Sequence, residues 1–168
     1  KGVGGAELGL ANEMAINQFI AHHSVIFQPE KKLMWVSTSP WQCGKYVAYD
    51  LNRIFSDSID FNHEIYTGDL TLPADSFLQQ QEYQQLMAYK RLAPVLRKQI
   101  KKKERLDEQT LHAFRHANPH FFYVYELLGD YYHATGQQDK ALRNWKKALL
   151  LPIPKRSESE RIEHKINN

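Results

Sequence analysis

Five residues near the C-terminal end of this 168-residue chain constrain its fold more than any other feature of the sequence. Two of them are small, Gly129 and Ala141, and three are large aromatic residues three or four positions away, Tyr125, Tyr132 and Trp145. Residues three or four apart share one face of a helix, and two helices approach closely only where that face carries small side chains. The aromatic rings then fill the grooves around the contact. The spacing therefore predicts two helices that pack tightly against each other.

Together with Leu128 before the glycine and Pro152 after the second helix, these residues resemble the tetratricopeptide repeat. Gly136 lies in the intervening turn, where a left-handed residue commonly ends a helix. The resemblance implies a helical hairpin over residues 120–152 that serves as a packing scaffold and not as a catalytic site. The alternative is an ordinary helical hairpin whose glycine and alanine merely pack.

The hairpin has no regular second copy before it. One repeat earlier, Val95, Lys98 and Asp107 stand where the small residues and the second tyrosine of the pattern should be. One unit cannot bury its own hydrophobic face, and about three are usually needed. We therefore expect the hairpin to pack on the helices that precede it and on a polar final helix over residues 157–166.

The whole C-terminal part, residues 73–168, is predicted to be helical. Asp75 or Ser76 can cap a helix that runs to Arg91, and Pro94 can open a second helix. Asp107 can cap a third helix that ends near residues 118–119. These helices form the predicted helical tail.

The N-terminal part is predicted to contain a helix and then a β-hairpin. Apolar residues recur at close to helical spacing over residues 7–21, and β-branched and aromatic runs at residues 24–27 and 33–37 flank a turn that contains Pro29. The apolar residues of both runs are consecutive, which favours a sheet covered on both faces. A two-stranded hairpin is not stable alone, so the sheet needs further strands.

The sequence offers little to complete that sheet. The one further candidate strand is the short region at residues 65–66, because residues 39–55 are aromatic and turn-rich and residues 57–71 are polar. We interpret residues 39–55 as an extended covering loop. Since the chain begins with Lys1 and not with Met, we expect the remaining strands to come from a segment that precedes it.

Three stretches of sequence also resemble a known family. They are AINQFIAHHSVIFQPE at residues 15–30, MWVS at residues 34–37 and YVAYDL at residues 46–51. They resemble the C-terminal portion of bacterial proteins similar to acyl-coenzyme A:6-aminopenicillanic acid acyltransferase, the C45 peptidase family. The resemblance covers roughly residues 10–55, about a quarter of the chain.

The resemblance implies an N-terminal nucleophile hydrolase of α+β class. Residues 1–72 would form the C-terminal part of its αββα sandwich, and residues 73–168 the helical tail. In that family autoproteolysis frees a cysteine whose own α-amino group is the base, and the thiolate attacks an amide or thioester carbonyl to form an acyl-enzyme. Here Cys43 lies in an aromatic loop with no Asp or His at a motif spacing. We therefore expect the nucleophile upstream of Lys1, and this chain to be inactive by itself.

Three residues of the family-like segment are candidates for lining a substrate pocket. His22 and His23 adjoin the first predicted strand, and Asn17 can donate an oxyanion-type hydrogen bond. A helix-surface or capping role is the alternative for Asn17. Adjacent residues on a strand point to opposite faces, so at most one of the two histidines is expected to face a pocket.

Other chemistry is not expected. A single cysteine excludes an internal disulfide and a cysteine-rich zinc site. His112 and His116 stand four apart, but Ala113 takes the position of the general-base glutamate of a zincin, so we expect a solvated face. The basic run at residues 101–103 lacks interleaved aromatic residues and suits a helix end. No cofactor, metal or nucleic acid is expected. No membrane span is expected either, since no apolar run approaches roughly 18 residues.

The missing N-terminal part of the same protein is the first expected partner. The alternative function is a non-catalytic interaction module in which the helical tail binds a protein partner, and a purely structural appendage is a third alternative. With 42% apolar and 24% charged residues and a net charge of +3, the composition suits a soluble globular protein. It does not distinguish these functions, nor a bacterial cytoplasmic from a periplasmic location.

Overall fold

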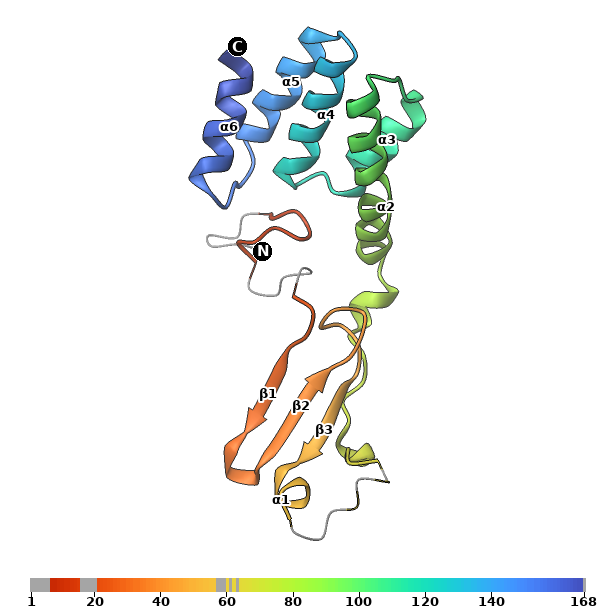
Figure 1. Ribbon diagram of the computed structural model, residues 1–168, viewed down its shortest axis with the longest axis vertical. Coiled ribbons are helices and arrows are strands. Elements are labelled where there is room, and N and C mark those ends of the chain that lie inside the picture. Colours follow the sequence, from red (N-terminus) through yellow and green to blue (C-terminus); the bar gives the residue numbers. More distant parts are fainter. Residues whose placement is uncertain (1–6, 16–20, 57–59, 61, 63, 168) are drawn as a thin grey trace. The chain divides into compact units, whose positions relative to one another are not determined.

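The computed structural model describes residues 7–15, 21–56, 60, 62 and 64–167. Its fold is mixed α+β, as expected, and it divides into two compact units (Figure 1). The sheet unit comprises Phe19–Gln80, and the helical unit comprises Lys1–Gln18 together with Gln81–Asn168. The helical unit therefore combines two stretches of chain that the sheet unit separates in the sequence. The domain boundary expected between residues 72 and 73 refers to the sandwich and stays a prediction.

Three antiparallel strands in the order β1-β2-β3 form the centre of the sheet unit (Figure 1). Strand β1 is Val25–Gln28, β2 is Leu33–Ser37 and β3 is Tyr46–Asp50. β-branched and aromatic residues, which favour strands, form most of β1 and β3, and β2 contains Trp35 and Val36. The short 3-10 helix Pro29–Lys31 turns the chain from β1 to β2. The predicted β-hairpin is therefore confirmed.

The third strand corrects the prediction of a covering loop at residues 39–55. Tyr46–Asp50 forms β3, which pairs with β2 along its whole length, and the short helix α1, Leu51–Ile54, follows it. Ala48 is fully buried opposite Trp35, so cross-strand packing stabilises a segment whose turn-rich flanks suggest a loop. The carboxylate of Asp50 accepts the backbone N–H of Asn52 and caps α1. Residues 65–66, the predicted candidate strand, form no strand.

Five helices form most of the helical unit (Figure 1). They are α2 (Gln81–Lys102), α3 (Glu108–Ala117), α4 (Phe122–Ala134), α5 (Gln138–Leu149) and α6 (Arg156–Asn167).

Helix α2 is continuous, although the sequence predicts a helix that ends near Arg91 and a second that opens at Pro94. Pro94 lies inside α2 on its exposed side. A proline removes one helical hydrogen bond, but the buried residues Leu86, Tyr89 and Leu96 on both sides of it hold α2 against its neighbours. The start also differs from the prediction, because residues 76–79 form a 3-10 helix capped by Asp75, and α2 begins only at Gln81.

Helices α4 and α5 are the two helices that the pattern at residues 120–152 predicts. They pack so closely that a Cβ atom at Gly129 would meet the indole ring of Trp145. Ala141 is fully buried at the same contact, and Gly136 in the turn has a left-handed φ of 75°. The indole nitrogen of Trp145 donates a 2.9 Å hydrogen bond to Asp130. Gly129 therefore stands where α4 meets the Trp145 side chain of α5.

The N-terminal helix predicted over residues 7–21 is wrong for residues 7–15, which form turns, while residues 16–20 lie outside the described residues. The side chain of Asn118 bonds both backbone groups of Leu10, accepting from its N–H at 2.9 Å and donating to its carbonyl at 2.7 Å. Ala11 has a left-handed φ of 69°, and the Asn12 amide donates to the carbonyl of Pro152. These tertiary hydrogen bonds hold the backbone in a non-helical path. We call residues 7–15 the clasp.

Candidate functional site

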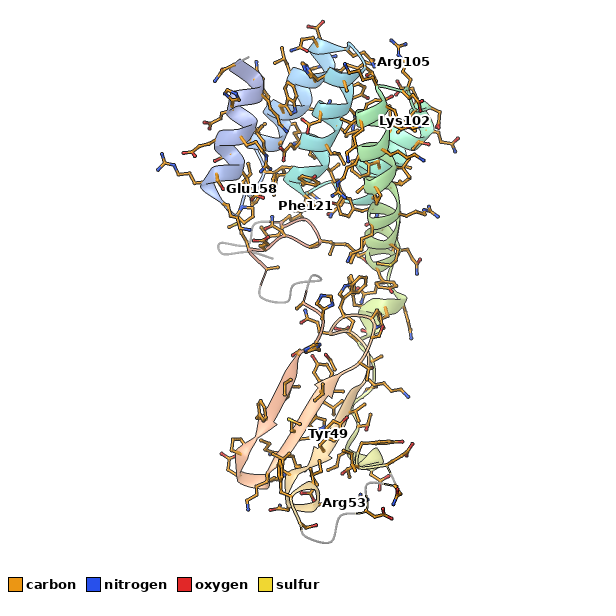
Figure 2. All side chains as sticks on the ribbon, in the orientation of Figure 1. Tyr49, Arg53, Lys102, Arg105, Phe121 and Glu158 are labelled. Carbon is orange, nitrogen blue, oxygen red and sulfur yellow. The ribbon has the colours of Figure 1, made fainter. Side chains whose placement is uncertain are left out.

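One face of the three-stranded sheet is entirely apolar. Cross-strand pairing places six residues on it, two from each strand: Val25, Phe27, Met34, Val36, Val47 and Tyr49. Figure 2 labels Tyr49 of β3. All six are exposed or half-buried, with Phe27 63% exposed and Val25 41% exposed. We call this surface the apolar sheet face.

The opposite face is partly covered within the sheet unit. The Trp35 indole donates a 2.8 Å hydrogen bond to the carbonyl of Leu70, and Ala48 on the same face is fully buried. The backbone N–H of Thr67 donates to the carbonyl of Ala48, which ties residues 67–72 to β3. The two faces of the sheet therefore differ: residues 67–72 lie against one of them, while the apolar sheet face keeps Val25 and Phe27 exposed.

Strand β1 is also an edge strand, since β2 is its one neighbour in the described part of the chain. The backbone N–H of Ser37 donates to the carbonyl of Ser24 at 2.9 Å, which makes this a hydrogen-bonded pair. Such pairs alternate along an antiparallel ladder, so the N–H and C=O groups of Val25 and Phe27 point away from β2. Proteins usually protect edges of this kind, because exposed strand groups recruit further strands. We call these groups the open edge.

The sequence-predicted site residues do not form one cluster. Asn17 lies outside the described residues. His22 and His23 are both exposed in irregular backbone before β1, so the alternation of a strand does not separate their side chains as predicted. Cys43 is buried in the loop between β2 and β3, and its pKa is raised by burial and by the negative charge of Asp75. A thiol with a raised pKa stays protonated at neutral pH and is a poor nucleophile.

Sequence reasoning missed the strongest electrostatic cluster, which joins α6 to α4. Glu126 is 2% exposed and accepts two 2.8 Å hydrogen bonds from Arg161 and one of 2.7 Å from Lys165. Lys165 also bonds both carboxylate oxygens of Asp130 at 2.9 Å. Burial acts to raise the pKa of Glu126, but the hydrogen bonds and charges of Arg161 and Lys165 outweigh it, so the pKa is lowered. The cluster is internally paired, which favours a structural role.

A hollow of about 440 Å³ lies beside this cluster in the helical unit. It is lined by residues of α2, α4, α5 and α6, namely Ile100, Asp130, His133, Ala134, Trp145, His164 and Lys165. Most of its lining is apolar, and the ring of His133 lies 5.6 Å from that of Trp145. We call it the helical hollow.

The described residues hold no group of three or more His, Cys, Asp or Glu side chains placed to bind a metal ion. His112 and His116 are both exposed on α3, with ring centres 4.1 Å apart. No helix in the described part of the chain is both long enough and apolar enough to cross a membrane.

In comparisons with known proteins, no protein-family model, curated protein or solved structure matches the chain.

Proposed function

We propose that this chain is the C-terminal part of an autoproteolytic acyltransferase or amidohydrolase of the C45 peptidase type, which acts on amide or thioester bonds. The apolar sheet face is the observation that carries the proposal. In an αββα sandwich one face of each sheet packs against a second sheet, so such a face must be apolar over all its strands. The open edge of β1 would receive a further strand of the same sandwich.

The nucleophile of this enzyme lies outside the chain. Cys43 is buried, its pKa is raised, and its loop is held by a hydrogen bond from the backbone N–H of Asp75 to the Cys43 carbonyl. Burial and a raised pKa do not suit a residue that attacks a carbonyl. The exposed His22 and His23 immediately before β1 remain candidate pocket residues, because an added strand at the open edge would adjoin them. Asn17 remains a candidate on the family resemblance alone. The tetratricopeptide-like hairpin is then a scaffold within the tail.

Mass spectrometry of the protein isolated from its own cells tests the proposal. We expect a species that contains further sequence before Lys1 and has been processed to expose an N-terminal cysteine. We also expect that species to hydrolyse amide or thioester substrates, while the 168-residue chain alone does not. Activity of the chain alone, or a native protein without such a cysteine, would contradict the proposal.

A matched pair of substitutions tests the apolar sheet face itself. Phe27 and Phe55 both belong to the sheet unit and are 63% and 80% exposed, but Phe27 alone lies on the apolar sheet face. In the unprocessed precursor, Phe27→Arg should prevent autoproteolysis, because it places a charge between two packed sheets. Phe55→Arg should leave autoproteolysis intact. Equal tolerance of both substitutions would show that no second layer covers the face.

The alternative is a non-catalytic interaction module, and the helical hollow is the observation that favours it. The clasp does not fill this hollow, since its hydrogen bonds go to Asn118 and Pro152 instead. If the alternative holds, the native protein should lack an N-terminal cysteine and hydrolytic activity. A purified binding partner should then lose affinity for the Ile100→Glu variant but not for the Phe55→Arg variant.

A further inference from the structure

A second hollow of the helical unit carries an unusual excess of positive charge. It has a volume of about 310 Å³ and lies among α3, α4 and α5. Its lining consists of Glu108, Arg115, Tyr132, Lys140, Arg143 and Asn144. Three of these side chains are cationic and one is anionic, so the lining has a formal charge of +2. We call it the cationic pocket.

The charges of the cationic pocket are weakly compensated. Lys140 lies 3.7 Å from Glu108, whose side chain is 80% exposed, and such a pair contributes little. Among the described residues, neither Arg115 nor Arg143 forms an ion pair with a carboxylate. The Nε atom of Arg115 is buried and has no hydrogen-bond partner there. A buried donor without an acceptor is costly, and Arg115 lines the pocket, so an anion there would add a favourable charge interaction to this guanidinium group.

The Tyr132 ring and the Asn144 side chain both contact Lys140 in the pocket. The Lys140 ammonium lies 5.2 Å from the centre of the Tyr132 ring, a cation-π contact. Burial raises the pKa of Tyr132, and the charge of Glu108 adds to this, while the adjacent Arg115 acts in the opposite direction. The Tyr132 hydroxyl therefore keeps its proton at neutral pH and remains a hydrogen-bond donor beside Arg115. The side chain of Asn144 bonds the carbonyl of Lys140 at 2.7 Å and fixes the α5 wall.

We propose that the cationic pocket binds the phosphate group of a phosphorylated ligand. Guanidinium groups match the geometry of phosphate oxygens, and an ammonium adds a point charge. A phosphate monoester carries a charge of about −1.5 to −2 at neutral pH, which matches the +2 of the lining. A carboxylate or a phosphodiester carries a single charge and would leave part of the pocket uncompensated. The site is separate from the apolar sheet face and does not depend on the acyltransferase proposal.

Titration of the full chain with inorganic phosphate and with O-phosphoserine tests this, with acetate as the comparison anion. Binding is followed by the ¹H–¹⁵N resonance of the Arg115 Nε group at low ionic strength. We expect saturable binding of both phosphate compounds, which separates recognition of the phosphate group from recognition of the rest of a ligand. We expect no saturable binding of acetate.

Two variants on α5 sharpen the test. Arg143→Gln removes a charge from the pocket and should weaken phosphate binding at least about tenfold, or about 1.4 kcal/mol. Lys146→Gln removes an equal charge from an exposed position of the same helix outside the pocket and should change the affinity less than about twofold. Both positions are exposed, so both variants should keep the helical circular dichroism of the parent. Equal weakening by the two variants, or absence of saturation, would overturn the proposal.

Discussion

Replacement of Glu126 by glutamine should destabilise the helical unit by about 3 kcal/mol. The change removes the anion at the centre of three short hydrogen bonds and leaves Arg161 and Lys165 without their buried partner. Breaking a buried ion pair by deleting one partner typically costs about 3–5 kcal/mol. The lower end applies here, because Arg161 is half-exposed and Lys165 keeps its bonds to Asp130. Urea unfolding monitored by circular dichroism at 222 nm measures the loss.

The pH dependence gives this prediction a second readout. The pKa of Glu126 is lowered in the folded protein, so its contribution is present above the unfolded-state value of about 4.3 and is lost as pH falls through the folded-state value. The difference between parent and Glu126→Gln should therefore be largest near neutral pH and should shrink in acid. Glu160→Gln is the control, because Glu160 forms an exposed pair with Arg156 and should change stability by less than about 0.5 kcal/mol. Equal effects of the two substitutions, or a pH-independent difference, would refute the reasoning.

Three further predictions concern packing, the clasp and the thiol. Gly129→Ala should lower the free energy of unfolding in urea by about 1–3 kcal/mol, because the new Cβ would meet Trp145. This clash outweighs the higher helix propensity of alanine. The control Gly68→Ala should be nearly neutral, because its Cβ would make only an ordinary contact at 3.8 Å. Asn118→Ala should leave both backbone groups of Leu10 without their hydrogen-bond partner, which should lower the free energy of unfolding by about 1–3 kcal/mol. It should also speed proteolytic cleavage within residues 7–15. Asn52→Ala, at an exposed position of α1, should not speed that cleavage. Cys43 should react with iodoacetamide far more slowly in the native chain than in 6 M urea, since burial and Asp75 raise its pKa; equal rates would contradict the buried placement.

The elements that sequence reasoning predicted well are those specified by their own residues. The two strands of the β1-β2 hairpin and the helices α3 to α6 carry local signals, such as the β-branched runs, the Asp107 cap and the spacing of Gly129 and Trp145. Helical and strand periodicity reports directly on such segments, because one face of each is buried.

The elements that it missed depend on residues far away in the sequence. The clasp has helical spacing of its apolar residues, but Asn118, 108 residues away, bonds the Leu10 backbone in another conformation. β3 is stabilised by cross-strand packing of Ala48 and Trp35. The Glu126–Arg161 ion pair joins residues 35 positions apart, and the sequence around either residue does not predict it. The positive charge of the cationic pocket could likewise not be predicted from the sequence, because α3 and α5 contribute different cations to it.

The division of the helical unit into two stretches of chain affects how the protein is made and how it can be cut. Contacts such as Asn12 with Pro152 join residues 140 positions apart, so residues 7–15 must wait for the intervening chain to be synthesised before they can dock. The sheet unit is contiguous and has no such delay. A recombinant fragment that starts at Gln81 would keep all five long helices yet leave the backbone partner of Asn118 behind. Subcloning at the apparent boundary would therefore yield a helical domain with an exposed docking strip along its α3–α4 and α5–α6 connections.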